Sequence, residues 1–486
     1  MMADASFDDA MRAAVAALGR GDLAGAEQGF AAATRADPAH GDAWFNLGWV
    51  QRARRRFVPA LESYATALAV GVAGSEEAHV NRAAILADHL YRPVEAKAEF
   101  LSALKRHPDY LPALLGLAQL HEDEGEIEAA REAYDRLLRR DAANGRALAR
   151  RAVLDLPIIG GAAAAALLGA LLAAARQPED RAELLFALAT AQDAAGRYAD
   201  AFATQSQANG LAQRLSPAQY DPVAFGASVD RQIAAFAAPL ALAPQCPVSP
   251  IFICGLFRSG STLTEQILAR HPAIVAAGEM EAIPAIASDI AAYPEAVGGL
   301  DADTREALAD SYRAEAALAA PGPGRRTDKR CDNFLHLGLV ATLFPDAAIV
   351  HTRRHPLDNL LSTLFLRFGD GVAYGHRWQD AVHHAVQQER LMVHWKRVIG
   401  EAIHDLDYDA LVRAPRETLA SLLGFLGLPW DDRLLSGGVE RAVRTASSWQ
   451  VRQPLHARSS GRWQHYADQL SEARAAFAAA GVALPD

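Results

Sequence analysis

Cysteine and basic charge are both scarce in this chain of 486 residues. It has three cysteines, and no two of them form a CxxC pair, which excludes a disulfide framework and a cysteine-based zinc site. Lysine and arginine total 48 against 58 aspartate and glutamate residues, so the formal net charge is −10. General nucleic-acid binding usually needs a broad basic face. We therefore expect no nucleic-acid partner, although a local basic site is still compatible with this charge.

The sequence also lacks the marks of a targeting or membrane segment. Its start contains Asp4, Asp8 and Asp9, with no basic stretch ahead of an apolar run, which is unlike a signal peptide. Residues 158–175 carry no charge and are long enough to be considered as a membrane span. They consist mostly of alanine and glycine, so we predict a packing helix and no membrane span. These features predict a cytoplasmic protein.

A pattern of small, aromatic and small residues recurs along the first half of the chain. The aromatic positions are Phe30, Tyr64, Phe100 and Tyr134, which are 34, 36 and 34 residues apart. Alanines flank them at helical spacing, so each copy would present one small face to a neighbouring helix. The pattern resembles the tetratricopeptide repeat, a helix–turn–helix unit. A weaker copy follows at Leu185, Leu188, Ala201 and Ala208.

The repeats and the prolines that follow them suggest a division of the chain. We expect an all-α repeat solenoid over residues 7–215, a linker over 216–247 and a second domain over 248–486. Stacked repeats form an extended concave surface. The array would either bind a peptide or protein or serve as a scaffold or dimerisation surface, and a homodimer is compatible with it.

The second half opens with a strand, a glycine-containing turn and a helix over residues 249–270. The backbone N–H groups and the dipole at the start of such a helix bind phosphate. Arg258 adds a guanidinium group to the turn. The other phosphate ligands that we expect there are Ser259, Gly260, Ser261 and Thr262.

This turn has the outer glycine spacing of a P-loop NTPase, from Gly255 to Gly260. The NTPase signature GxxxxGK[ST] then requires a lysine that contacts the β- and γ-phosphates. Ser261 stands at that position. A P-loop-like kinase or NTPase is therefore the less favoured alternative.

A second strand, over residues 347–352, ends in another basic motif. Arg354 is followed by Pro356, Asp358 and Ser362. A guanidinium fork with a hydroxyl at a helix start suits a phosphate dianion. Ligands of open parallel α/β sheets bind beyond the carboxyl ends of the strands. The two motifs are therefore expected to hold two phosphate groups of one nucleotide.

The two motifs together resemble those of sulfotransferases, particularly the protein-tyrosine branch. The segment GLFRSGSTLTEQIL is similar to their 5′-phosphosulfate-binding loop, and residues 354–362 are similar to their 3′-phosphate-binding element. The resemblance covers about residues 248–470. It implies a P-loop-like α/β domain with a central parallel sheet. It also implies 3′-phosphoadenosine-5′-phosphosulfate (PAPS) as donor, adenosine 3′,5′-bisphosphate (PAP) as product, and no metal.

The same resemblance implies catalytic groups. The family's glutamate base falls in residues 278–281, where Glu279 matches better and Glu281 is the alternative. Lys329 lies in a segment similar to the family's Asp-Lys-x-Pro-x-Asn-Phe, and it would stabilise charge at the transferring group. A histidine base, as in small-molecule sulfotransferases, would be His336 or His351.

Further nucleotide contacts are implied towards the end of the chain. Tyr408 lies in a segment similar to the family's Tyr-Glu-x-Leu and would contact the nucleotide. Ser447 and Arg462 lie in segments similar to the one that closes over the donor, as contacts of the 3′-phosphate or ribose. The acceptor would be a hydroxyl of a protein tyrosine, a carbohydrate or a small compound. The repeats slightly favour a peptide or protein.

Overall fold

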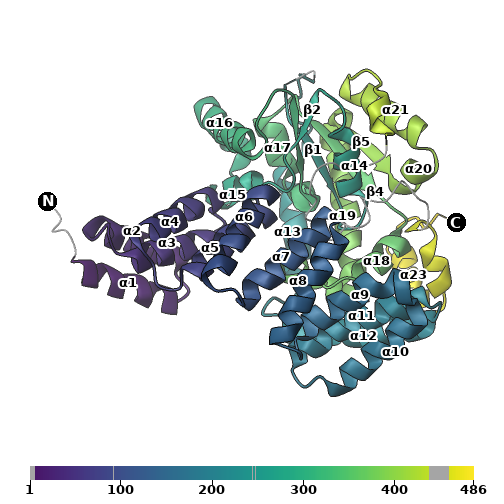
Figure 1. Ribbon diagram of the computed structural model, residues 1–486. Helices are drawn as coiled ribbons and strands as arrows, with labels where there is room; N and C mark the ends of the chain where they lie inside the picture. The colour runs from purple at the N-terminus through teal and green to yellow at the C-terminus, as the bar shows by residue number, and fades with distance from the viewer. Residues whose placement is uncertain (1–5, 91, 244, 247, 437–458, 486) are drawn as a thin grey trace. The chain divides into compact units, whose positions relative to one another are not determined.

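The computed structural model describes residues 6–485 except for residues 91, 244, 247 and 437–458 (Figure 1). The chain divides into two compact units, and the boundary falls between Ala142 and Ala143. This boundary lies inside the range predicted for the repeat domain, so the last repeat-like helices belong to the second unit.

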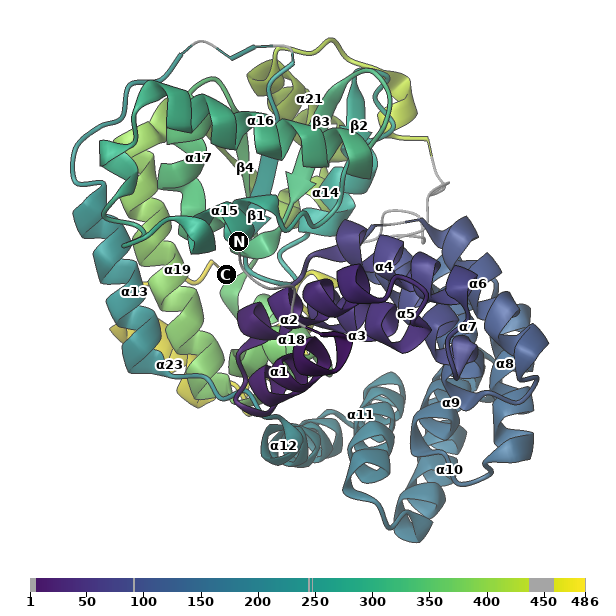
Figure 2. The ribbon, with the colours of Figure 1, turned by 90° about the vertical axis from the view of Figure 1, so that its left-hand side faces the viewer.

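The first unit consists of helices packed in successive pairs, as Figure 2 shows. The helices are α1 (Phe7–Gly19), α2 (Leu23–Ala36), α3 (Gly41–Ala53), α4 (Phe57–Val70), α5 (Ser75–Asp88), α6 (Pro93–Arg106), α7 (Leu111–Glu124) and α8 (Ile127–Arg140). Short turns join the two helices of each pair, and the second helix of one pair also contacts the first helix of the next. This is the arrangement expected of a helical repeat array.

The recurring aromatic residues explain why these helices pair. Phe30, Tyr64, Phe100 and Tyr134 lie on the second helix of successive pairs, and all four are buried. Gly116 on α7 faces the ring of Phe100 so closely that a Cβ atom would lie 2.3 Å from a ring carbon. Close helix crossing therefore depends on a small residue opposite the aromatic one. The predicted repeats are confirmed in this unit.

The second unit begins with four further helices: α9 (Gly145–Ile159), α10 (Gly161–Ala174), α11 (Pro178–Ala194) and α12 (Tyr198–Leu215). Gly160 separates α9 from α10, so the uncharged run of residues 158–175 is shared between two helices. Ala164, Ala165 and Leu168 of α10 are buried in a core with α9 and α11. Among the described helices, none is both long and apolar enough to cross a membrane.

The segment predicted as a linker contains a helix, α13 (Pro222–Ala235), which packs on α19 (Trp378–Ile399). Its residue Val229 is fully buried, as is Trp395 of α19, and Phe236 packs against Trp395. The prolines indicated a connection, but Asp221 caps a helix that begins at Pro222, a favourable first helical position. The segment is therefore partly built into the core.

The centre of the second unit is a parallel sheet of five strands in the order β2-β3-β1-β4-β5. The strands are β1 (Ile251–Gly255), β2 (Ile274–Ala276), β3 (Arg325–Lys329), β4 (Ala348–Arg353) and β5 (Ile403–Asp407). Ile253 of β1 pairs in register with Lys329 on one side and Val350 on the other. All five carboxyl ends therefore lie at the same edge of the sheet.

Helices cover both faces of this sheet, as seen in Figure 1. Phe252 and Cys254 of β1 face one core and Ile251 and Ile253 face the other, as strand alternation requires. The first core, which also receives α13 and α19, contains α15 (Ala282–Asp289), α16 (Ala302–Ala319) and α17 (Leu337–Leu343). The second contains α14 (Ser261–Leu268), α20 (Tyr408–Arg413) and α21 (Pro415–Leu426).

A third core joins helices α11 and α12 to the carboxyl edge of the sheet. It contains α18 (Pro356–Leu364), the 3₁₀ segments η3 (Asp370–His376) and η7 (Arg462–Tyr466), and α23 (Ser471–Ala479). Asn209 of α12 donates a hydrogen bond from Nδ2 to the backbone oxygen of Leu364, at 3.0 Å. The last repeat-like pair is thus built into the α/β domain. The predicted fold class, helical repeats followed by an α/β domain with a central parallel sheet, is confirmed.

Candidate functional site

The loop between β1 and α14 has a backbone that few sequences could adopt. Gly255 has a φ of +150°, and a Cβ atom there would lie 2.4 Å from the backbone oxygen of Thr352. Gly260 has a φ of +100°, and a Cβ atom there would lie 2.6 Å from the ring of Tyr408. Arg258 also has a positive φ, of 72°. A non-glycine residue in this region costs on the order of 1–3 kcal/mol, as residues at functional sites often do.

The three hydroxyl groups of the loop have different surroundings. Ser259 donates from Oγ to the backbone oxygen of Leu256 at 2.6 Å and lies 2.7 Å from Oγ1 of Thr352. Ser261 starts α14 and lies 3.3 Å from the sulfur of Cys331. Thr262 follows in the same turn and is buried. Ser259 therefore fixes the loop to strand β4, whereas Ser261 and Thr262 lie at the helix start, where an anion would bind.

The two predicted phosphate-binding elements meet at Arg258. Its Nε donates to Oγ of Ser362 at 3.0 Å, and its backbone oxygen accepts from Nη1 of Arg354 at 3.3 Å. Burial, and next the positive charge of Arg354, lower the pKa of Arg258 to about 10. Burial likewise lowers the pKa of Arg354, which stacks over the ring of Tyr408 with its guanidinium carbon 4.9 Å from the ring centre. A buried and a half-buried arginine brought together in this way would favour a bound anion.

Asp358 organises the segment that returns to this site from the C-terminal end. Its carboxylate accepts hydrogen bonds from the backbone N–H groups of Gly461 and Trp463, at 2.6 and 2.7 Å. Arg354 donates from Nη2 to the backbone oxygen of Ser459. The sequence placed Asp358 within the 3′-phosphate motif but gave it no role. In the sequence, its position near a helix start, four residues after Arg354, was the feature that could have indicated a structural role for Asp358.

Arg462 lies in this returning segment but is held from a distant helix. Its Nη2 lies 3.0 Å from Oδ1 of Asp193 on α11, and its guanidinium carbon lies 4.7 Å from the centre of the Phe365 ring. Its charge contributes to lowering the pKa of both Arg258 and Arg354. The role of Arg462 as a nucleotide contact stays a prediction. Ser447 lies outside the described residues.

The two candidate bases have different partners. Lys329 ends β3 and forms an ion pair with Glu279; the lysine side chain is 1% exposed and the glutamate side chain 32%. Glu281 pairs instead with Arg330, at 2.8 Å, and Arg330 also holds Asp332 at 2.6 Å. Lys329 and Arg330 are neighbours at a strand end, so their side chains leave the chain in opposite directions. Glu279 and Glu281 therefore form ion pairs with different basic residues, Lys329 and Arg330.

The Glu279–Lys329 pair lies close to the start of α14. The sulfur of Cys331 contacts Ser261, and both charges of the pair act on this thiol. Burial raises the pKa of Cys331 to about 11; the charge of Lys329 lowers this pKa and that of Glu279 raises it. Backbone N–H of Lys329 also donates to the oxygen of Gly278 at 2.8 Å, which fixes the glutamate loop against β3. A carboxylate, an ammonium group and the helix start are therefore gathered at one place on the sheet edge.

The two histidines considered as bases have structural partners. His351 lies between Asp405, 2.8 Å from Nδ1, and Gln388, 2.8 Å from Nε2, inside the second unit. Nδ1 of His336 lies 2.8 Å from the hydroxyl of Tyr293, and burial lowers the pKa of His336 to about 4. Both rings are engaged within the protein core. The geometry therefore favours the glutamates over these histidines.

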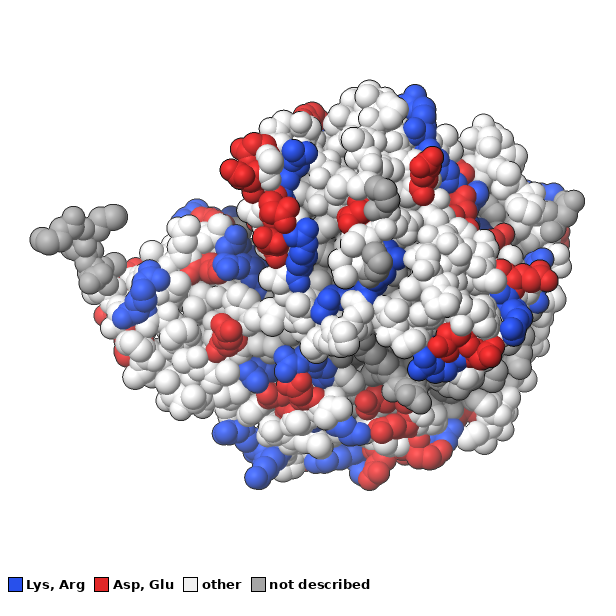
Figure 3. All heavy atoms as spheres, turned by 90° about the horizontal axis from the view of Figure 1, so that it is seen from above, with Lys and Arg blue, Asp and Glu red and all other residues white. Residues whose placement is uncertain are grey.

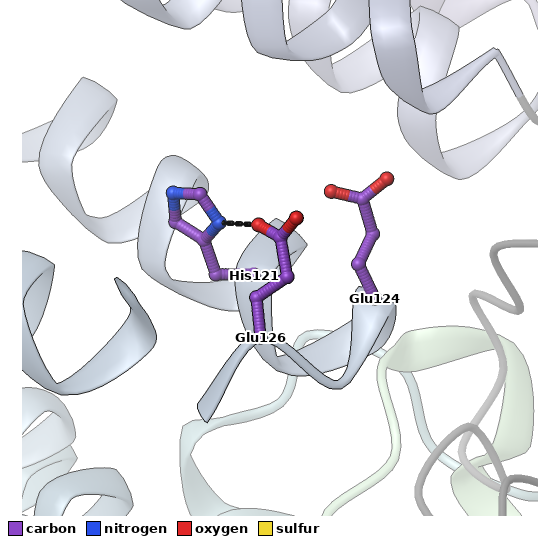
Figure 4. Close-up of side chains that lie close together, drawn as sticks. All are labelled: His121, Glu124 and Glu126. Atoms are coloured by element: carbon purple, nitrogen blue, oxygen red, sulfur yellow. Dashed lines mark hydrogen bonds and ion pairs between the residues drawn. The ribbon is translucent and has the colours of Figure 1, made fainter. Parts of the chain in front are cut away.

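One group of described side chains, in the first unit, could hold a metal ion. Figure 4 shows His121 and Glu126 joined by a hydrogen bond, with the carboxylate of Glu124 facing the same space. Lys97 lies 2.9 Å from Glu126 and 3.9 Å from Glu124. Its ammonium group offsets part of the negative charge of the two carboxylates, and Oε2 of Glu124 is buried without a hydrogen-bond partner among the described residues. On the face shown in Figure 3, basic and acidic side chains are interspersed, which is unlike a broad nucleic-acid-binding surface.

Comparison with known proteins agrees with both halves of this description. Residues 250–432 match the model of the sulfotransferase family, and residues 90–154 match a tetratricopeptide repeat model. The resemblance inferred from the sequence motifs is thus confirmed for these two segments. The matched sulfotransferase segment contains the β1–α14 loop, Glu279, Lys329 and the Arg354–Ser362 element.

Two curated proteins are similar to part of the chain. A protein of Aquifex aeolicus (strain VF5), described only as uncharacterized, is 34% identical over 240 residues, which are 46% of this chain and 31% of that protein. The protein-tyrosine sulfotransferase of Drosophila melanogaster is 25% identical over 234 residues, which are 44% of this chain and 46% of that protein. The chain therefore spans less than half the length of either relative.

Two solved structures are similar to parts of the chain. The sulfotransferase domain from the Synechococcus PCC 7002 olefin synthase has a TM-score of 0.35 at 21% identity, covering 49% of this chain and 98% of that one. A tetratricopeptide repeat protein from Parabacteroides merdae ATCC 43184 has a TM-score of 0.37 at 21% identity, covering 43% of this chain and 84% of that one.

Proposed function

We propose that this protein transfers a sulfuryl group from PAPS to a hydroxyl acceptor and releases PAP. The observation that carries the proposal is the meeting of Arg258 with Ser362 and Arg354, which joins the two phosphate-binding elements at one sheet edge. Buried Nε of Arg354 has no hydrogen-bond partner among the described residues. A buried donor without a partner is costly, and a phosphate oxygen would satisfy it. The residues therefore fit a ligand with two separate phosphate groups.

The residues at the edge of the sheet suit direct sulfuryl transfer. PAPS supplies an electrophilic sulfur whose bond to the 5′-phosphate oxygen breaks as the acceptor oxygen bonds to sulfur. In this proposal Glu279 accepts the proton of the acceptor hydroxyl as that bond forms. Lys329, Arg258 and the N–H groups at the start of α14 stabilise the negative charge left on the phosphate oxygen. Arg354 and Ser362 hold the 3′-phosphate.

The position of Ser261 supports this proposal over a P-loop-like kinase or NTPase. An NTPase needs a lysine there, whereas Ser261 is buried against Cys331. Lys329 instead approaches from β3, a neighbouring strand, and pairs with a carboxylate. That pair supplies an acid–base group and a cation next to the loop, as transfer to a hydroxyl requires.

We further propose a protein tyrosine as the acceptor, with carbohydrates and small hydroxyl compounds as the alternatives. Its support is the partial similarity to the Drosophila enzyme and the repeat array of the first unit, a scaffold suited to peptide binding. We propose that this unit engages the acceptor protein.

A transfer assay with ³⁵S-labelled PAPS tests the proposal. The full chain would be incubated with a tyrosine-containing peptide, an oligosaccharide and a simple phenol in separate reactions. We expect labelled product and an equal amount of PAP in the peptide reaction. Label on the oligosaccharide or phenol alone would replace the protein tyrosine with a carbohydrate or a small hydroxyl compound as the acceptor. No transfer to any acceptor, together with magnesium-dependent phosphoryl transfer from ATP, would replace the proposal with a kinase.

A further inference from the structure

The segment of residues 459–466, here called the returning segment, is fastened to a helix far away in sequence. Asp193, at the end of α11, lies 3.0 Å from Nη2 of Arg462 and also accepts a hydrogen bond from the hydroxyl of Tyr466. The side chains of Asp193 and Arg462 are each 25% exposed, so neither interaction is a fully solvated surface pair. Such partly buried, charge-assisted contacts stabilise a fixed geometry better than surface ion pairs do.

The other end of the returning segment is fastened to the proposed 3′-phosphate element. Asp358 accepts from the N–H groups of Gly461 and Trp463, and Arg354 donates to the oxygen of Ser459. The Trp463 ring stacks on His355, with ring centres 5.0 Å apart and an angle of 5°. Helix α11 and the 3′-phosphate element therefore hold one short segment between them.

Arg462 is the residue through which this arrangement reaches the nucleotide site. It lies between Gly461 and Trp463, whose backbone N–H groups donate to Asp358, and it stacks on Phe365, at the end of the helix that carries Ser362. The rings of Phe365 and Tyr466 lie 4.7 and 5.6 Å from its guanidinium carbon and fix its plane. Arginine has five N–H donors in a rigid fork, so a carboxylate can orient one edge while another edge binds phosphate.

We propose that Asp193 is a positioning residue for the 3′-phosphate of the nucleotide, acting through Arg462 and the returning segment. The inference rests on the proposed function. It makes α11, a helix with the repeat pattern, a structural part of the nucleotide site. Loss of the Asp193 carboxylate would release Arg462 and Tyr466 together. Affinity for a ligand with a 3′-phosphate would fall, whereas affinity for the same nucleotide without it would not.

Calorimetric titration of the full chain carrying Asp193→Asn, with PAP and with adenosine 5′-monophosphate (AMP), tests this inference. We expect about tenfold weaker binding of PAP, the effect of losing one charge-assisted contact. Binding of AMP should not change, and this difference separates positioning from general damage. Glu183→Gln is the matched control. Glu183 also lies on α11 and pairs with Arg367 of the α/β domain, but it does not contact the returning segment.

The outcomes are distinguishable. PAP binding by Asp193→Asn within twofold of the unmodified chain would overturn the inference and leave the proposed function standing. Equal losses for PAP and AMP would also overturn it, since they would show a structural role only. A tenfold loss of PAP affinity in Glu183→Gln would also overturn it, since it would show that the packing of α11, and not the Asp193 carboxylate, determines PAP affinity. Failure of the unmodified chain to bind PAP would overturn the proposed function, and this inference with it.

Discussion

Arg258 and Ser362 are 104 residues apart in sequence, yet Nε of the arginine donates to Oγ of the serine at 3.0 Å. The contact joins the loop after β1 to the helix after β4, two neighbouring strands of the sheet. The loop positions the buried Arg258 next to the half-buried Arg354, an arrangement that we expect to bind an anion.

Arg354→Ala should weaken PAP binding by about 10- to 100-fold, because the variant loses charge-assisted contacts to the 3′-phosphate and the tie to Ser459. Arg353→Ala is the matched control. Arg353 is the preceding residue and is exposed, and its partners are Glu389 and Asp405. Calorimetry on both variants measures the difference. Equal PAP affinity in Arg354→Ala and the unmodified chain would refute the assignment of the 3′-phosphate site.

Glu279→Gln should lower kcat by about 10²- to 10⁴-fold, because glutamine keeps the shape of the side chain but cannot accept the proton. Glu281→Gln should have a much smaller effect, since Glu281 forms an ion pair with Arg330, 2.8 Å away. Steady-state kinetics at saturating PAPS compare the two variants. Thermal unfolding of each variant checks that removing a carboxylate near the buried Lys329 has not destabilised the fold. A larger loss of kcat in Glu281→Gln would reverse the assignment of the base.

Asp328 should make stability depend on pH near neutrality. Burial raises its pKa from the ordinary 3.8 to about 7, although Asn333 and Tyr312 donate hydrogen bonds to it at 3.1 and 3.3 Å. Between these pH values the folded protein holds a proton that the unfolded chain has released. The free energy of unfolding therefore falls as pH rises from about 4 to 7, by about 4 kcal/mol at most.

Asp328→Asn removes this titration, so the free energy of unfolding should depend less on pH. Urea unfolding at pH 5 and pH 7.5 would measure the difference. Asp303→Asn, at an exposed position on α16, is the control and should leave the pH dependence as it is. An unchanged slope in Asp328→Asn would show that the pKa of Asp328 is not raised in the folded protein.

Local sequence patterns were sufficient to predict the repeats and the strand–turn–helix structure around Arg258. Phe30, Tyr64 and Phe100 recur at nearly constant spacing, and the helix pairing that this spacing predicts depends only on neighbours in sequence. The loop around Arg258 was likewise recognisable, because strand, turn and helix follow each other directly. Such features are encoded within a few tens of residues.

Contacts between distant segments were not predictable in this way. Nothing near Arg462 in sequence indicates that its partner is Asp193, because the pairing depends on how α11 packs against η7. The partners of Glu279 and Glu281 also needed the structure. Similarity to the family's motif favoured Glu279 but gave neither glutamate a partner. The structure pairs Glu279 with Lys329 and Glu281 with Arg330, and the role of Glu279 as the base stays a prediction.

Titration of the full chain with PAP, with AMP and magnesium-ATP as controls, tests the central claim most directly, namely that one nucleotide occupies both phosphate-binding elements. We expect micromolar or tighter binding of PAP and at least about tenfold weaker binding of AMP, since the contacts of Arg354 and Ser362 would be lost. PAP binding no tighter than that of AMP, or a preference for magnesium-ATP, would show that no nucleotide bridges the two elements.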